Sequence, residues 1–290
     1  MTSKYPTQYD VRAKIAQLFI YPIKSCAGIE LKEAVLTDTG LDLDRAWMVV
    51  DEQGVFLSQR ELPRMALIQP LLKTYDMIVK APGMLALHVS IDEVEKPVTV
   101  TVWEDTVKAF DMGDLAAQWF SDFLGKTVRL VRFDPEQTRL SSMKWTNGIE
   151  AKNGFDDGFA VLVTNVASLK ALNDKLTAEG DQAVTMPRFR PNVVLTGVEA
   201  HDEDRLDTLN IETQEGLAQL KHVKPCVRCT IPDVDLQSGK QGTAVGDMLQ
   251  SYRADPQMDG GITFGMNAIV LSGEGSTLRV GQAVGANYTF

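Results

Sequence analysis

The sequence predicts a mainly β protein with a few helices, an α+β fold, and three observations support this. Over the first hundred or so residues, short segments rich in β-branched and aromatic residues alternate with glycine and proline turn signals. Two segments with helical periodicity follow, and further strand-like segments fill the rest of the chain. The 290 residues, 44% of them hydrophobic, suffice for one large or two ordinary domains. We expect two domains, at residues 1–115 and 116–290.

Four strands are expected in the first domain, at Ile15–Tyr21, Arg45–Val50, Met65–Leu72 and Val98–Trp103. The last of these alternates Val and Thr, which is typical of a half-buried strand. Turns between the strands are indicated at Gly28, Gly40, Gly54 and Ala81-Pro82-Gly83.

Two helices are expected in the middle of the chain. The first is capped by Asp114, carries Leu115, Trp119, Phe120 and Phe123 at helical spacing, and ends at Gly125. The second begins after Thr164 or Asn165, carries Val166, Leu169, Leu172 and Leu176 on one face, and ends at Gly180. Between them, Val128–Phe133 is expected to be a strand and Thr138–Gly158 a long loop over a site. Later strands are expected at Val193–Thr196, Leu217–Lys221, Thr263–Leu271 and Leu278–Val284.

Composition excludes several classes of protein. The net charge of −10 provides little cationic surface for a phosphate backbone, so no nucleic-acid partner is expected. No apolar run approaches the roughly 18 residues that cross a membrane, so no membrane association is expected. The N-terminal residues show no secretory signal, and three cysteines do not suit a disulfide scaffold. Together these features predict a cytoplasmic protein.

Several familiar catalytic motifs are missing from the sequence. It contains no Gly-x-Gly-x-x-Gly after a strand, no P-loop and no Gly-x-Ser-x-Gly elbow. Its three histidines are scattered without metal-ligand spacing.

The Cys-x-x-Cys in Pro225-Cys226-Val227-Arg228-Cys229-Thr230 has four interpretations. Structural zinc needs four ligands, and only Cys26 and a histidine such as His222 could complete the set. A thioredoxin-like redox pair should open a helix, whereas residues 230–233 look extended. Two ordinary, partly buried thiols are a third possibility. The fourth is a single thiolate that binds a soft metal, with Arg228 lowering its pKa.

Three further segments place cationic side chains at the ends of expected strands. Lys24 and Ser25 follow the first strand, where they suit a phosphate grip, although a lone lysine is usually solvated. Arg45 enters the second strand and by itself indicates a surface ion pair. Arg188 and Arg190 precede a buried strand, in a segment that Pro187 and Pro191 keep from being helical. Together these four cations predict a pocket for a phosphorylated ligand.

The segments 21–26, 41–47, 188–195 and 225–229, taken in this order, resemble the MOSC family. Within that family they resemble the branch with an N-terminal MOSC β-barrel domain. This branch includes the mitochondrial amidoxime reducing component and bacterial reductases that confer resistance to N-hydroxylated purines. The resemblance runs from about residue 15 to residue 284. It implies an N-terminal MOSC β-barrel-like domain followed by a MOSC β-barrel domain that binds the cofactor.

The resemblance also implies a mononuclear molybdenum cofactor, a pterin with a dithiolene chelate and a terminal phosphate. Carried over residue by residue, Cys229 is the metal ligand and the catalytic residue, and Cys226 is a neighbour. Residues that match the binding site for the pterin and its phosphate are Lys24, Ser25, Arg45, Arg190 and Asn192. A short segment contributes Asp157, Gly158 and Phe159, through main-chain N–H groups because its residues differ from the hydroxyl-bearing version in the mitochondrial relatives. Arg253 also matches a family pattern, without an assigned role.

The implied activity is reduction of N-hydroxylated compounds such as hydroxylamines, amidoximes and N-hydroxylated base analogues. The alternative is a module that carries molybdenum cofactor or sulfur without turnover of its own. MOSC domains also occur in cofactor sulfurases, which carry a large pyridoxal-phosphate domain, and no such domain fits in this chain. A zinc-stabilised binding protein is a third possibility. Because the chain lacks a dinucleotide motif and the four cysteines of an iron–sulfur domain, we expect a separate electron-transfer protein, a ferredoxin or a flavoprotein reductase.

Overall fold

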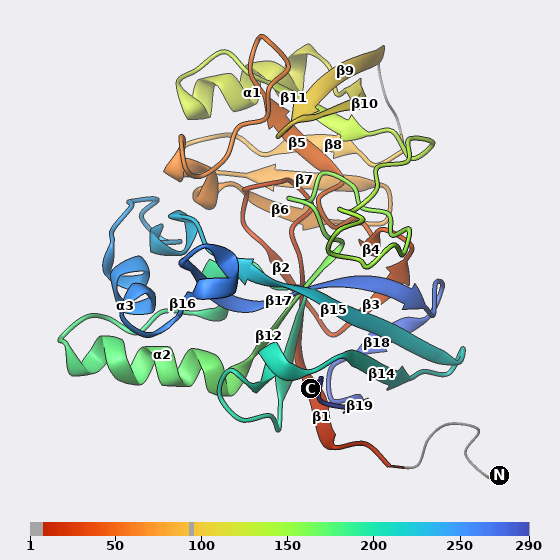
Figure 1. Cartoon of the computed structure of the whole chain (residues 1–290). Coiled ribbons are helices and arrows are strands. Elements are labelled where there is room, and N and C mark those ends of the chain that lie inside the picture. Colours follow the sequence, from red (N-terminus) through yellow and green to blue (C-terminus); the bar gives the residue numbers. More distant parts are fainter. Residues whose placement is uncertain (1–7, 93–95, 290) are drawn as a thin grey trace.

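The computed structural model describes residues 8–92 and 96–289. Within these residues the fold consists mostly of strands with three α-helices, which confirms the mainly β fold class. Figure 1 shows two groups of strands, one above the other, with the helices around them. No helix in the described part of the chain has both the length and the apolar character needed to cross a membrane.

Seven strands of the lower group in Figure 1 close into a barrel. Their order is β12, β13, β1, β19, β14, β15 and β17, and β17 pairs back with β12. Along β1, the buried Val11, Ala13 and Ile15 alternate with exposed residues, which is the period of two expected for a strand. The barrel strands are β1 Val11–Ile20, β12 Val161–Asn165, β13 Val193–Thr196, β14 Thr208–Glu212, β15 Leu217–Val227, β17 Gly261–Ser272 and β19 Ala283–Ala286.

Closure of the barrel depends on a glycine in β17. Gly265 has φ +79°, and a Cβ there would lie 2.6 Å from the carbonyl oxygen of Val163 in β12. Only glycine adopts this conformation without strain and allows the two backbones to approach so closely.

The upper group of strands forms two small antiparallel sheets. One has the order β5 (Trp47–Val50), β11 (Arg129–Phe133), β10 (Asp105–Asp111) and β9 (Lys96–Val102). The other consists of β6 (Gln69–Leu72), β7 (Asp76–Lys80) and β8 (Leu87–Ser90). Helix α1 (Asp114–Leu124) packs against both, and its Trp119, Phe120 and Phe123 complete their shared core.

Two further helices cover the barrel. They are α2 (Val166–Ala178) and α3 (Ala244–Tyr252), which pack on aromatic residues of the barrel and its loops, among them Tyr21, Phe189 and Phe264. The remaining strands are β2 (Ile29–Leu31), β3 (Glu33–Thr37), β4 (Gly40–Leu41), β16 (Ala254–Asp255) and β18 (Thr277–Arg279). Five short 3₁₀ helices complete the described elements: η1 Pro63–Leu67, η2 Met186–Phe189, η3 Asp202–Arg205, η4 Ile231–Asp233 and η5 Pro256–Met258.

The two halves of the sequence are interleaved in space. The first strand, β1, lies in the barrel, whereas β11, which follows α1, lies in the upper sheet. Near the C-terminus, β18 pairs with β3 from the first 40 residues. The expected boundary between residues 115 and 116 falls within α1, and the division of the sequence into two domains there stays a prediction.

Five expected features differ in detail from the structure. Residues 186–189 form η2, although Pro187 and Pro191 were expected to keep this segment from being helical; a proline is tolerated in the first turn of a helix. Residues 65–67 belong to η1 rather than to a strand, because Pro63 fixes the first turn of a 3₁₀ helix. The expected strand 278–284 is divided into β18 and β19 by a turn at Gly281. The N-cap of α1 is Gly113 rather than Asp114, which is the first helical residue. Residues 231–233 form η4 and are not extended.

Other elements were not expected from the sequence. Helix α3 is one. The expected strand at residues 217–221 is also longer than expected, because β15 continues to Val227. This continuation places Cys226 on a strand at the edge of the site.

Candidate functional site

A cavity of about 230 Å³ lies at the end of the barrel that faces the upper sheets. All nine residues that the sequence predicts for the site line it: Lys24, Ser25, Arg45, Asp157, Gly158, Phe159, Arg190, Asn192 and Cys229. Six cationic side chains and two carboxylates line the cavity, so it is strongly positive within an acidic chain. These cations are Lys24, Arg45, Arg60, Arg190, Lys224 and Arg228.

The barrel register brings these distant segments together. Leu18, Val193, Val163, Met266 and Pro225 occupy one continuous row of paired residues across β1, β13, β12, β17 and β15. Segments that leave the barrel from this row therefore start side by side. The segments after β1, before β12, before β13 and at the end of β15 supply most of the cavity wall.

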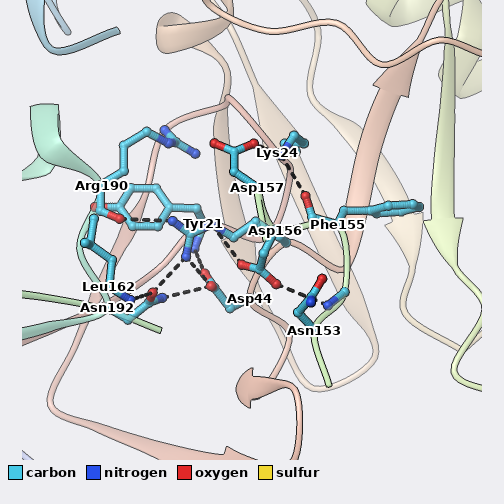
Figure 2. A network of polar contacts seen from close by, with 12 residues as sticks. Tyr21, Lys24, Asp44, Asn153, Phe155, Asp156, Asp157, Leu162, Arg190 and Asn192 are labelled. Carbon is cyan, nitrogen blue, oxygen red and sulfur yellow. Dashed lines mark hydrogen bonds and ion pairs between the residues drawn. The ribbon is translucent and has the colours of Figure 1, made fainter. Parts of the chain in front are cut away.

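Arg45 is fixed by a buried polar network, which Figure 2 shows around Asp44 and Asn192. Its guanidinium donates to the Asp44 carboxylate, to Asn192 Oδ1 at 3.0 Å and to the Arg190 carbonyl oxygen at 3.0 Å. The Asn192 amide in turn donates to Asp44 Oδ2 at 2.8 Å and accepts the Leu162 N–H at 3.0 Å. The interpretation of Arg45 as a surface ion pair is therefore wrong, because only 12% of its side chain is exposed. The Arg45 and Asn192 side chains therefore hold together the chain segments that form the site.

Arg190 differs because one of its nitrogens is unpaired. Nη1 donates to the Cys26 carbonyl oxygen at 2.6 Å, while the buried Nη2 has no partner among the described residues. The guanidinium lies 4.2 Å from the ring centroid of Tyr21 (Figure 2). The same ring centroid lies 4.7 Å from the Arg45 guanidinium. Burial, together with the nearby Arg45 charge, lowers the pKa of Arg190 to about 10, so it is still a cation at neutral pH. An unpaired N–H on a buried cation is suited to an anionic ligand.

Lys24 is held by the loop that precedes β12. Its Nζ donates to the Phe155 carbonyl oxygen at 2.7 Å and to Asp157 Oδ1 at 2.5 Å (Figure 2). Burial lowers the pKa of Lys24, and the Asp157 charge opposes this shift. An ammonium has three donors, so one N–H of Lys24 is still available to a ligand.

The neighbouring carboxylates have opposite pKa shifts. Burial raises the pKa of Asp156 to about 7, with Asp44 adding to the shift and Arg45 opposing it. Burial also raises the pKa of Asp157, but Lys24 and the Trp103 indole more than compensate and hold it well below its usual range.

Main-chain N–H groups of Asp157, Gly158 and Phe159 have no recorded acceptor among the described residues. These groups remain available to a ligand in the cavity.

The backbone is left-handed at three lining residues. Ser25, Arg45 and Arg190 have φ values of 66°, 48° and 58°. Such conformations cost a non-glycine residue on the order of 1–3 kcal/mol and cluster at functional sites. They direct these side chains toward the cavity from turns that a regular strand could not form.

The two thiols of the Cys-x-x-Cys have different surroundings. Cys226 is partly buried and accepts a hydrogen bond from Arg228 Nη1 at 2.9 Å. Cys229 is exposed, and its Sγ lies 3.8 Å from Arg60 Nη1 on the opposite wall. Because β15 ends before Cys229 and only η4 follows, the pair does not open a helix as a thioredoxin-like pair would. Within the described ranges, no three His, Cys, Asp or Glu side chains gather where they could hold a metal ion, so nothing here supports structural zinc.

Several residues of the site were not expected from the sequence. Arg60 and Lys224 line the cavity without belonging to a motif. Arg139 organises the loop before β12: its Nη1 donates to Asn153 Oδ1 and to the carbonyl oxygens of Gly154 and Asp156, and its Nε pairs with Asp105. Nothing in the sequence around these three residues indicates the contacts, which are made across the fold.

Two residues that the sequence singled out lie elsewhere. Arg188 pairs with Asp235 at 2.8 Å and does not line the cavity, so only three of the four expected cations meet there. Arg253 pairs with Asp204 and donates to Thr263, also outside the cavity.

The chain is similar in sequence to several known proteins. The chain is 34% identical over 256 residues to mitochondrial amidoxime reducing component 2 of Homo sapiens, which covers 83% of this chain and 73% of that protein. It is 33% identical to mitochondrial amidoxime-reducing component 1 of Mus musculus, over 83% of this chain and 72% of that protein. It is also 31% identical to molybdenum cofactor sulfurase of Bos taurus, over 82% of this chain and 29% of that protein. The chain thus spans less than a third of the sulfurase.

Two family models match the chain in succession. Residues 12–127 match the MOSC N-terminal beta barrel domain, and residues 150–285 match the MOSC domain. Both models cover residues that line the cavity, Lys24 and Arg45 in the first and Arg190 and Cys229 in the second. The chain therefore belongs to the MOSC family, in the branch that carries an N-terminal MOSC beta barrel domain.

Proposed function

We propose that this chain is a molybdenum-cofactor-dependent reductase of N-hydroxylated compounds. The observation that carries the proposal is the cavity itself, in which an exposed cysteine thiol faces the same space as a buried cation with an unpaired N–H. Relatives named for amidoxime reduction and for a molybdenum cofactor support the assignment.

The residues present fit a pterin cofactor with a terminal phosphate. Arg190 Nη2, the buried and unpaired Arg228 Nε, and the main-chain N–H groups of residues 157–159 are donors without a protein acceptor among the described residues. The Cys229 thiol is a soft ligand of the kind that molybdenum accepts. Cys229 would hold the metal, and Lys24, Ser25, Arg190 and the 157–159 segment would hold the pterin and phosphate. Asn192 would position Arg45 rather than bind directly, because both of its amide N–H groups already donate, to Asp44 and to the Phe19 carbonyl oxygen. Arg45 uses three of its five N–H groups on Asp44, Asn192 and the Arg190 carbonyl oxygen, so it would position Arg190 and have donors left for the cofactor.

When bound, the cofactor supplies two-electron chemistry at molybdenum. The overall reaction cleaves the N–O bond of the substrate, takes up two electrons and two protons, and yields the amine or amidine and water. The cavity's cations neutralise the charge of the phosphate, and the fold holds them in place before the ligand arrives. With a pKa raised to about 7, the Asp156 carboxyl can hold a proton at the edge of the cavity at neutral pH. The electrons come from a separate protein, a ferredoxin or a flavoprotein reductase.

A second candidate is a carrier of molybdenum cofactor or of sulfur. The exposed Cys229 thiol would serve this function equally well, and the sulfurase relatives share this part of their chains. The two candidates differ in turnover, because only the reductase consumes an N-hydroxylated substrate.

The two cysteines provide the test. Protein made in a host that synthesises molybdenum cofactor is assayed for molybdenum, pterin and zinc per chain, and for amidoxime reduction with an artificial electron donor. Cys229→Ser should abolish reduction, because a hydroxyl is a poor ligand for the metal, whereas the matched Cys226→Ser should keep most of it.

Three outcomes contradict the reductase. Equal loss from both substitutions, together with loss of bound zinc, indicates a structural metal site. Bound cofactor without reduction of any N-hydroxylated compound indicates the carrier. Absence of both molybdenum and pterin from the purified protein excludes the reductase and the carrier of molybdenum cofactor, and leaves the sulfur carrier.

A further inference from the structure

A group of three side chains forms a wall beside the exposed thiol. Phe56 and Trp103 lie with their ring centroids 5.0 Å apart, and the Arg60 guanidinium lies 4.6 Å from the Trp103 ring and 5.8 Å from the Phe56 ring. We call Phe56, Arg60 and Trp103 the aromatic wall. All three come from the upper group of strands and their loops, whereas Cys229 follows the barrel strand β15.

Arg60 brings the aromatic wall next to the thiol, and Trp103 in the wall is accessible to solvent. Arg60 Nη1 lies 3.8 Å from Cys229 Sγ, and 47% of the Trp103 side chain is exposed although it is a large apolar residue. Trp103 Nε1 donates to Asp157 Oδ1 at 3.1 Å, which ties the ring to the segment that lines the cavity. Trp103 also has a left-handed backbone, with φ 56°, in the turn between β9 and β10. Of the aromatic wall, Arg60 lines the cavity, whereas Trp103 adjoins the cavity through Arg60 and Asp157. The exposed tryptophan thus offers a surface to a ligand that extends out of the cavity.

Arg60 retains donors for such a ligand. Among the described residues its only ion pair is between Nε and Glu61 Oε1 at 3.7 Å. The Glu61 side chain is 53% exposed, so this pair contributes little. The guanidinium thus lies against the rings, and its Nη1 group lies toward the thiol. Flat cationic and aromatic surfaces favour flat, conjugated ligands, and the N–H groups favour an oxygen acceptor.

We propose that Arg60 contacts the substrate and makes the enzyme prefer compounds whose N-hydroxylated group, such as an amidoxime, carries an aromatic ring. The inference rests on the proposed reductase function. The ring of the substrate lies on the aromatic wall, and Arg60 donates a hydrogen bond to the oxygen of the N–O group. Arg60 keeps its proton throughout, so it supplies the hydrogen bond but neither of the two protons of the reaction.

Two substrates with the same reacting group test the preference. Benzamidoxime carries a ring and acetamidoxime carries a methyl group in its place. Arg60→Ala should raise KM for benzamidoxime roughly tenfold or more, because it removes a charge-assisted contact and part of the wall. The rise for acetamidoxime should be several times smaller, because this substrate loses the same hydrogen bond to its oxygen but has no ring in contact with the wall. Arg60→Lys should keep the activity on acetamidoxime but lose the preference for the ring, since lysine has charge but no flat face.

A matched control lies four residues further along the chain. Arg64 also places its guanidinium over an aromatic ring, 4.6 Å from the Phe123 centroid, but it does not line the cavity. Arg64→Ala should leave both amidoximes unaffected. A readout without turnover is calorimetric titration of benzamidoxime in the absence of any electron donor, where Arg60→Ala should weaken binding by a similar factor.

The outcomes separate this inference from the proposed function. An unchanged ratio of the two amidoximes in Arg60→Ala, with an active wild type, overturns the inference alone. Loss of molybdenum and pterin from Arg60→Ala also overturns it, because Arg60 would then hold the cofactor. A wild type that contains no molybdenum or pterin and reduces neither amidoxime overturns the proposed function.

Discussion

Arg190 illustrates how a single residue of the site depends on its neighbours. Its backbone is left-handed, and its carbonyl oxygen accepts a hydrogen bond from Arg45. Its Nη1 donates to the Cys26 carbonyl oxygen, and together these features fix the guanidinium. The Tyr21 ring supports it from one side, and Gly28 leaves room for that ring, since a Cβ at residue 28 would lie 2.5 Å from Tyr21 Cε1. The one free nitrogen, Nη2, is thereby oriented before any ligand binds, so little conformational entropy is lost on binding.

The free nitrogen of Arg190 leads to a prediction for cofactor retention. Arg190→Ala should lower the molybdenum and pterin content of the purified protein about tenfold or more, since a hydrogen bond to a charged group contributes about 1.5–3 kcal/mol. The measurement is metal and pterin content per chain after gel filtration. Arg188→Ala is the matched control, because Arg188 pairs with Asp235 outside the cavity. Full cofactor content in Arg190→Ala with unchanged activity would contradict the assignment.

At the scale of elements, η3 is joined to α2 and β15 by buried polar groups. Glu203 in η3 accepts a hydrogen bond from Ser168 Oγ in α2 at 2.7 Å, and His222 Nδ1 in β15 lies 3.1 Å from the Glu203 carbonyl oxygen. Glu203 Oε1 has no partner among the described residues, and the side chain is fully buried. Burial, and to a lesser extent the Asp204 charge, raises the pKa of Glu203 to about 7.

This raised pKa predicts that Glu203 destabilises the fold at high pH. The folded state binds the proton more tightly than the unfolded state, so the stabilisation is complete below about pH 4.5 and is lost as pH rises through about 7. Glu203→Gln mimics the protonated form. It should raise the free energy of unfolding at pH 8 by on the order of 2 kcal/mol and have little effect at pH 5.

Urea unfolding of both proteins at pH 5, 6, 7 and 8 measures this difference. Burial lowers the pKa of the nearby His222 to about 4, but this histidine is present in both proteins, so its contribution largely cancels. Glu212→Gln, at an exposed position on β14, is the control. A difference between Glu203→Gln and wild type that does not depend on pH would show that Glu203 is ionised throughout this range.

At the scale of the whole molecule, the cations that meet in the cavity could be predicted from the sequence better than the detailed geometry of their contacts could. Lys24, Arg45 and Arg190 each stand next to an expected strand, and the ends of neighbouring strands meet in a barrel. Arg188 was wrongly grouped with them because residues two apart share a side in an extended chain, whereas Arg188 lies in η2 and Arg190 is the left-handed residue that ends it. Arg60 could not be found in this way, since its approach to Cys229 joins residues 169 apart in the sequence.

Charge is also distributed unevenly over the whole molecule. The chain carries a net charge of −10, yet six cations line a single cavity that contains two carboxylates. A positively charged cleft in a negatively charged surface focuses the electric field and attracts small anions to the cavity. It does so without a broad basic surface, which explains why bulk composition excluded nucleic acid but not a phosphorylated ligand.

The last prediction concerns the source of electrons. The chain has three cysteines, of which Cys26 is buried in the core of the upper sheets, so it has too few thiolates for an iron–sulfur cluster with four cysteine ligands. It also has no glycine-rich dinucleotide motif after a strand. The isolated protein should therefore reduce benzamidoxime with dithionite-reduced methyl viologen but not with NADH alone. Absorbance at the NADH band, followed with pure protein and benzamidoxime, measures this directly, and adding a flavoprotein reductase with a ferredoxin is the positive control. Steady oxidation of NADH without any added protein would reveal a nucleotide site in this chain, and the electron donor would then not need to be a separate protein.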